Sequence, residues 1–272
     1  MAVVVVAAAT VAYTVRDRLF AGQISVQSIQ PAFVTPIGSD GSLTHVDVGF
    51  PWTEQGYCLG QFRAEAKETF GQIRVGAVIS RTNSNENCAG VGSNGRWATA
   101  PLSLRTPIGV RQVVRDSNGT PLPVFALTAM LRCRDAISSG AAPLADDVPI
   151  NNAVALPKVA LPANRSGELD PSAKWFAKVG LFVRSGASFT LSVPDDWMGR
   201  LSIGWGSPAT RTMNLHVSGC TSDITWLVFA GGFWVDEPSC VPIVVNSGSQ
   251  QETVQIGVGA ACPGQAPPPP RI

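Results

Sequence analysis

Apolar and polar residues alternate along short segments throughout the chain, and this period of two predicts β-strands. Within residues 58–68 the side chains of Phe62, Ala64 and Ala66 fall on one face, and the polar side chains between them fall on the other. Residues 72–80 repeat the pattern. Such alternation indicates sheets with one face in contact with solvent and the other face covered by a core.

Segments of this kind occupy both halves of the chain and are separated by Gly, Pro and Ser. The Asn118-Gly119 pair between two of them predicts a hairpin. Residues 226–235 are apolar on both faces, which is typical of a central strand, and Gly231-Gly232 predicts a bend inside it. The predicted strands are 43–50, 58–68, 72–80, 98–105, 112–115, 122–131, 175–184, 188–193, 200–205, 212–218, 224–235, 241–246 and 252–258.

We predict an all-β protein with two tandem β-sandwich domains, Ig-like or jelly-roll-like, at residues 23–137 and 172–263. Between them, residues 138–171 are rich in small residues and proline and lack aromatic residues, so they are predicted to form an extended linker. Scattered apolar residues leave open that part of this segment lies as an edge strand over a neighbouring domain. Residues 264–272, with four consecutive prolines, predict a solvated polyproline tail.

The N-terminal segment 1–22 is predicted to be a hydrophobic signal or anchor. Its run 2–12 is apolar except for Thr10, which gives it the length of a signal-peptide core and leaves it shorter than a membrane span. No basic residue precedes the run. We therefore favour a retained membrane anchor over a cleaved signal, with the rest of the chain extracytoplasmic.

Charge and composition exclude two classes of protein. The 272 residues carry 20 basic and 19 acidic side chains, so the net charge of +1 gives no general electrostatic reason to bind nucleic acid. The hydrophobic content of 45% is too high for a disordered chain. A net charge near zero weakens repulsion between copies, so self-association stays open.

The cysteines show no CxxC spacing and no short-range cluster with histidine, so the sequence predicts no metal site. We predict disulfides and an oxidising compartment, against the alternative of buried free thiols. Proximity favours Cys58–Cys88 in the first half. The six residues are Cys58, Cys88, Cys133, Cys220, Cys240 and Cys262.

Two pairings of the last four cysteines are open. Proximity favours Cys220–Cys240, which leaves Cys133–Cys262 to join the two halves of the chain. The alternative pairs Cys240 with Cys262 and Cys133 with Cys220, so that the second bond crosses between the domains. The sequence does not decide between these two maps.

Two stretches resemble a known group of proteins. The first, 72–124, includes QIRVGAVISR and APLSLRTPIGVRQVVRDSNGTPLPV, and the second, 226–263, includes WLVFAGGFWVDEPSCVPIVV and VQIGVGAACP. Together they resemble uncharacterised, membrane-anchored or secreted proteins of high-GC actinobacteria. The resemblance implies an extracytoplasmic location and a β-rich fold, and it implies no activity and no catalytic residues.

The sequence contains no GxSxG, HExxH, P-loop or GxGxxG motif. Its two histidines, His45 and His216, each lie in an alternating strand, where a lone histidine is usually structural or at the surface. We therefore predict no catalytic residue and no cofactor. The expected function is that of a non-enzymatic cell-envelope protein, a binding or structural module.

Tryptophans of the second half are the main binding candidates. Trp197 lies in a polar turn, Trp205 lies in IGWGSP, and Trp234 precedes two acidic residues. Exposed tryptophans beside acids stack on sugar rings or anchor protein partners, so the expected ligand is envelope polysaccharide or another envelope protein. Core tryptophans at sheet ends are the alternative. The candidate binding residues are Trp197, Trp205, Trp234, Asp195, Asp196 and Asp236.

Two competing classes remain. A carbohydrate-active hydrolase would use Asp195 or Asp196 with Asp236 or Glu237, and it requires two of these carboxylates to face each other across a cleft. An assembly component would pair its strands or its tail with another envelope protein, and an exposed apolar patch would favour that class.

Overall fold

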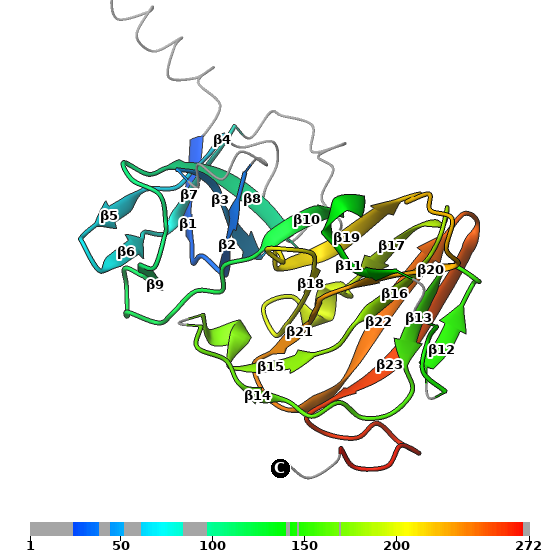
Figure 1. The fold of residues 1–272 in the computed structure, drawn as a ribbon. Coiled ribbons are helices and arrows are strands. Elements are labelled where there is room, and N and C mark those ends of the chain that lie inside the picture. Colours follow the sequence, from blue (N-terminus) through cyan, green and yellow to red (C-terminus); the bar gives the residue numbers. More distant parts are fainter. Residues whose placement is uncertain are drawn as a thin grey trace, which may run out of the picture.

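A computed structural model shows an all-β protein, as predicted (Figure 1). In the part of the chain that it describes, the only helical elements are three short 3-10 turns, η1 (Cys133–Asp135), η2 (Pro171–Ala173) and η3 (Asp195–Trp197). Within the same residues no helix is long and apolar enough to cross a bilayer. The predicted anchor at 1–22 lies outside the described residues. These are 24–37, 44–51, 61–83, 97–139, 142–145, 147–168 and 170–268.

In the described residues, the first unit contains three small sheets, each with three strands, in the orders β1-β7-β4, β2-β3-β8 and β5-β6-β9. Their inward side chains, among them Val46, Val48, Phe50 and Ile73, form one hydrophobic cluster. The strands are β1 (Ile24–Ile29), β2 (Phe33–Pro36), β3 (His45–Pro51), β4 (Gln61–Arg63), β5 (Ala66–Glu68), β6 (Gln72–Val75), β7 (Val78–Asn83), β8 (Trp97–Ser103) and β9 (Gln112–Arg115).

The second unit is a sandwich of two sheets. A nine-stranded sheet has the order β14-β15-β21-β18-β19-β17-β22-β23, with β10 beside β19. Its strands are β10 (Ala126–Leu131), β14 (Asn164–Arg165), β15 (Trp175–Lys178), β17 (Ser188–Ser192), β18 (Leu201–Trp205), β19 (Thr212–Ser218), β21 (Gly231–Val235), β22 (Ser239–Ser247) and β23 (Gln250–Val258).

A five-stranded sheet, with the order β11-β20-β16-β13-β12, packs against this sheet. Leu181 and Phe229 from the five-stranded sheet share one core with Leu191 and Ile243 from the nine-stranded sheet. The five strands are β11 (Ala136–Ser139), β12 (Asp147–Ile150), β13 (Val154–Pro157), β16 (Leu181–Arg184) and β20 (Trp226–Phe229).

The predicted strand 224–235 is in fact two strands that belong to different sheets. Strand β20 pairs with β16 in the five-stranded sheet, and β21 pairs with β18 in the nine-stranded sheet. The glycines at the start of β21 allow the neighbouring strands to come close to it. A Cβ on Gly231 would lie 2.1 Å from the Gly204 carbonyl oxygen, and one on Gly232 would lie 2.0 Å from the Ala177 carbonyl oxygen. The predicted bend therefore carries the chain from one sheet to the other.

The segment 138–171 does not form the extended linker that its composition predicts, and the alternative of an edge strand is confirmed by β12 and β14, which lie at sheet edges. Strand β13 lies between β12 and β16, and Val154, Ala155 and Leu156 are all buried. Strand β10, placed by sequence in the first domain, pairs in parallel with β19 of the second unit. Proline and small residues here fill sheet positions because neighbouring strands supply the hydrogen bonds and the apolar cover.

The disulfides follow the second of the two maps, so the pairings Cys220–Cys240 and Cys133–Cys262 are wrong. Cys133 is bonded to Cys220 and Cys240 to Cys262. The parallel register of β10 and β19 carries Cys133 and Cys220 to the same end of the sheet, because each follows the end of its own strand. Cys58 and Cys88 lie outside the described residues.

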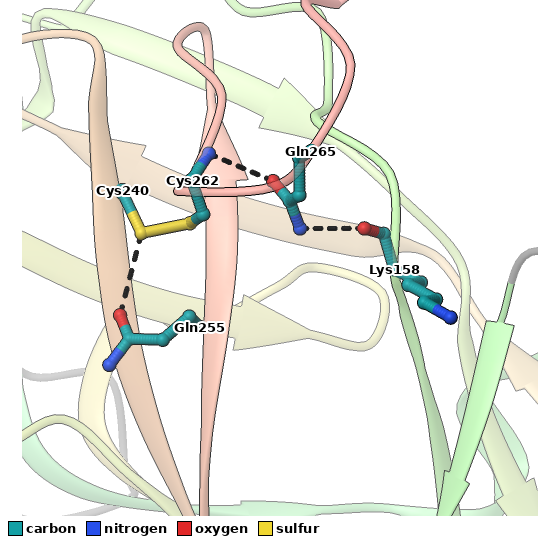
Figure 2. Close-up of a disulfide and its surroundings, with 5 residues drawn as sticks. All are labelled: Lys158, Cys240, Gln255, Cys262 and Gln265. Carbon is teal, nitrogen blue, oxygen red and sulfur yellow. Dashed lines mark hydrogen bonds between the residues drawn. A yellow bond between two sulfur atoms is a disulfide. The ribbon is translucent and has the colours of Figure 1, made fainter.

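The second disulfide holds the end of the chain against the sandwich (Figure 2). The Gln265 side chain accepts a hydrogen bond from the Cys262 N–H at 3.0 Å and donates one to the Lys158 carbonyl at 2.6 Å. Residues as far as Gln265 are thus fixed to the fold, although the sequence predicts a solvated tail from 264 onward.

Strand β2 joins the two units. Val34 belongs to the core of the first unit, while its neighbour Phe33 points the other way into the core of the second. The Phe33 ring stacks on Phe125 at 5.1 Å and meets Trp97 edge-on at 5.6 Å. The Val34 N–H donates to the Pro123 carbonyl at 2.9 Å, so backbone pairing reinforces the aromatic contact.

Gly49 makes the position of Phe33 possible, and its replacement tests this junction. A Cβ on Gly49 would lie 2.1 Å from the buried Phe33 ring, so Gly49→Ala is expected to lower the free energy of unfolding by about 2 kcal/mol. Gly71→Ala is the matched control, because a Cβ at that glycine meets no atom within 4 Å. Urea unfolding of both variants measures the difference. Equal stability of the two variants would show that Phe33 does not need this space.

Candidate functional site

A groove of about 1050 Å³ is lined by residues of both units. It lies beside β10, the strand by which the chain passes from the first unit to the large sheet. The first unit contributes residues 108–113 and Leu122 to its walls. The second contributes β10, residues 209–211 and Trp234. The groove receives side chains from both units.

A buried ion pair forms the floor of the groove. The Asp170 carboxylate lies 3.2 Å from the Arg211 guanidinium, with the two side chains 8% and 11% exposed. Asp170 also accepts hydrogen bonds from the Val124 N–H and from the backbone and hydroxyl of Ser172, at 2.7 and 2.6 Å for the latter two. Arg211 donates to the hydroxyls of Ser172 and Ser202.

This arrangement leaves neither charge free for chemistry. A carboxylate that serves as base or nucleophile must reach the substrate, whereas Asp170 already makes four interactions with three residues, Val124, Ser172 and Arg211. Its bond to Val124 ties the chain that leaves the first unit to Arg211 of the second. Asp170 therefore holds the walls of the groove in place, and Arg211 supplies the charge that makes its burial tolerable.

A second ion pair supports the rim. Arg111, which lines the groove, lies 2.9 Å from Glu68, and both side chains are largely buried. Burial raises the pKa of Glu68, but hydrogen bonds from the Arg105 N–H and the Arg111 guanidinium outweigh it and hold the pKa below its usual value. Val110 and Met130, also in the lining, are 92% and 65% exposed and offer apolar contact area.

Two of the three predicted tryptophans are buried. Trp205 donates its indole N–H to the Val179 carbonyl at 2.9 Å and meets Phe233 edge-on in the sandwich core. Trp234 lines the groove but is only 9% exposed, since it packs on Phe176 at 4.5 Å. Trp234 and its neighbour Phe233 point to opposite faces of the sheet. Trp205 and Trp234 therefore do not form one stacking surface.

Trp197 belongs to a separate cluster around Arg200. The Arg200 guanidinium carbon lies 4.5 Å from the centre of the Trp197 ring. The guanidinium also lies 3.5 Å from one carboxylate oxygen each of Asp236 and Glu237. The other carboxylate oxygen of Asp236 is buried and has no hydrogen-bond partner among the described residues.

The acids proposed for hydrolysis do not line the groove. Asp195 and Asp196 lie in η3, and Arg200 is bonded to both Asp236 and Glu237. The lining of the groove contains none of these four carboxylates. The structure thus keeps Asp236 and Glu237 close to one arginine and brings no two of the four acids together across this groove.

The two histidines lie outside the groove, and the described residues contain no cluster of metal ligands. His216 is hydrogen-bonded to the Thr190 hydroxyl at 2.9 Å, and His45 lies 3.3 Å from the Thr44 hydroxyl. Neither lines the groove. Among the described residues, no group of three His, Cys, Asp or Glu side chains lies close enough together to hold a metal ion.

Sequence reasoning missed Asp170 and Arg211. The Asp170-Pro171-Ser172 motif carries a local signal, because Asp at the N-cap and Pro at the first position are typical of the start of a helical turn, and η2 begins there. Nothing local links this turn to Arg211. The pair exists because η2 packs on β18 and β21 next to the start of β19.

Removal of one partner tests the floor of the groove. Arg211→Met leaves the Asp170 carboxylate buried without its counter-charge and is expected to lower the free energy of unfolding by about 3 kcal/mol. Arg63→Met, in the exposed pair with Glu65, is the control and is expected to cost no more than about 1 kcal/mol. Urea unfolding measures both. If adding Asp170→Asn does not recover part of the loss, the pair is not coupled.

The pKa of Glu68 predicts a pH dependence of stability. A carboxyl group whose pKa is lowered in the folded state stabilises it above the unfolded pKa, near 4.5, and that contribution disappears as pH falls through the folded pKa. Glu68→Gln should therefore lose less stability than the parent protein between neutral and acidic pH. Asp47→Asn should lose more, because burial raises the pKa of Asp47 and reverses the sign. Urea titrations across this pH range would contradict the assignment if both variants followed the parent curve.

No protein-family model matches the chain, and no curated protein matches it either. The resemblance to membrane-anchored or secreted actinobacterial proteins therefore stays a prediction from the sequence. Function has to be inferred from the groove, its buried ion pair and its exposed apolar wall.

Proposed function

We propose that the protein is a non-enzymatic binding module of an extracytoplasmic compartment, and that the groove between its units receives a segment of another envelope protein. The observation that carries the proposal is the contrast within the groove. Its buried charges, Asp170 and Arg211, are neutralised by each other, while Met130 and Val110 are exposed on its walls. A site of this kind offers a shaped surface with apolar contact area.

The location rests on the two disulfides, which form and persist in oxidising compartments. One of them joins β10 to β19 and so fixes a wall of the groove. The apolar N-terminal run and the resemblance to membrane-anchored or secreted proteins support the same location.

A protein partner fits the groove better than a polysaccharide does. Sugar-binding sites usually present the open face of an aromatic ring, and Trp234, the tryptophan in the lining, is covered by Phe176. The exposed apolar side chains, Met130 on β10 and Val110 across from it, are typical of protein-binding surfaces. Met130 is also flexible enough to adapt its shape to a partner.

Site-specific photocrosslinking in cells that make the full chain tests this proposal. A photoreactive amino acid at Met130 is expected to form a discrete adduct with one envelope protein. The same amino acid at Glu252, exposed on β23 and outside the groove, serves as the matched control and is expected to give no such adduct. Thr128→Trp, which fills the groove, is expected to reduce the Met130 adduct at least about tenfold, because it blocks the apolar contact.

Three results would contradict the proposal. They are identical adducts from both positions, no adduct from Met130, and a Met130 adduct that polysaccharide-degrading enzymes remove. The third result would favour a carbohydrate ligand. Thermal unfolding of the Thr128→Trp variant shows whether the fold is intact, since Thr128 is exposed and its replacement leaves the core unchanged.

A further inference from the structure

Two neighbouring loops of the first unit each present a large apolar side chain to solvent. Phe70, in the turn between β5 and β6, is 102% exposed, and Val110, just before β9, is 92% exposed. The other large apolar side chains that are exposed in the described residues range from 38% to 69%. Phe70 and Val110 are therefore the two most completely uncovered of them.

The strand register places these two side chains close together. Strands β6 and β9 are parallel, with Gln72 opposite Gln112. The Gln112 N–H donates to the Gly71 carbonyl at 3.1 Å, which extends the pairing toward the loops. Phe70 and Val110 each precede their register residue by two positions, so they stand at the same end of adjacent strands. We call this end of the first unit the 70/110 tip.

The loops that carry the tip are held by buried contacts. Glu68 accepts hydrogen bonds from the Arg105 N–H at 2.7 Å and from the Arg111 guanidinium at 2.9 Å. Arg111 also donates to the carbonyls of Thr106 and Pro107 at 2.7 and 2.8 Å. One carboxylate and one guanidinium thus connect both loops. Phe70 and Val110 are consequently held in exposed positions by a backbone that these bonds fix.

The charge around the tip is positive. The two loops that form it, residues 69–71 and 105–111, contain Arg105 and Arg111 and no acidic side chain. Arg111 is paired with Glu68. Arg105 is exposed at the base of the second loop and adds a cation without an acidic partner among the described residues.

We propose that the 70/110 tip inserts into the surface of an anionic lipid bilayer, with the exposed Arg105 side chain beside it binding a lipid headgroup. A protruding pair of apolar side chains suits the boundary between headgroups and acyl chains. Either signal alone binds a membrane weakly, and the apolar pair together with the cation of Arg105 supplies both. The tip shares Val110 with the groove, whereas Phe70 does not line it, so position 70 reports on membrane contact separately from the groove.

Photocrosslinking of the purified full chain to vesicles tests the proposal at single positions. The vesicles contain equal parts of phosphatidylcholine and phosphatidylglycerol, and the photoreactive amino acid replaces Phe70. An adduct with lipid acyl chains is expected. The matched control places the same amino acid at Leu144, which is 69% exposed but lies in the second unit, and is expected to give no adduct. Position-specific readout distinguishes the tip from any contact that the N-terminal run makes.

Further variants separate the apolar from the electrostatic contribution. Val110→Asp should lower the lipid adduct at position 70 at least about tenfold, because it places a carboxylate where an apolar group enters the bilayer. Leu144→Asp should leave it unchanged. Vesicles of phosphatidylcholine alone, or added salt, should also lower it. Equal lipid adducts at positions 70 and 144, no lipid adduct at 70, or an adduct there with a second copy of the chain would overturn the proposal.

Discussion

The Asp170 carboxylate is the constraint on which the relation between the two units depends. It lies between the Val124 N–H, which belongs to the chain leaving the first unit, and the Arg211 guanidinium of the second. A buried carboxylate is tolerated only when charge and hydrogen bonds compensate its desolvation. Arg211 and the two groups of Ser172 provide that compensation, so η2, the start of β19 and the chain before β10 are all held in one place.

The same compensation decides what the groove can do. The Asp170–Arg211 pair positions the walls, because each of its charges is already bonded to groups of the protein. Contact area for a partner comes instead from Met130 and Val110, which the sheet and the Glu68–Arg111 pair hold in the open. Two ion pairs therefore have the same role, one at the floor and one at the rim. Each buried pair fixes the backbone that holds nearby apolar side chains in an exposed position.

The strand register explains the disulfide pairing and the position of β10, which the local sequence does not predict. Parallel pairing of β10 with β19 brings Cys133 to Cys220 across 87 residues of sequence, and it draws β10 away from the domain in which its position in the chain would place it. Proximity along the chain favoured another pairing because short loops close at a lower entropic cost. In the folded protein, the pairing of β10 with β19 has already brought distant segments together. The separation of two cysteines along the chain therefore no longer decides which of them form a disulfide.

The sequence alone determined the all-β class, most strand positions and the bend at Gly231-Gly232, because alternation and glycine act over a few residues. The same local rules misjudged residues 138–171, where buried Val154 and Leu156 depend on strands far away in the chain. They also left Trp205 open between a binding position and a core position, which the bond of its indole N–H to the Val179 carbonyl within the core decides. Only the tertiary structure decided these cases and the Asp170–Arg211 pair, since burial and charge pairing arise between segments that no local pattern connects.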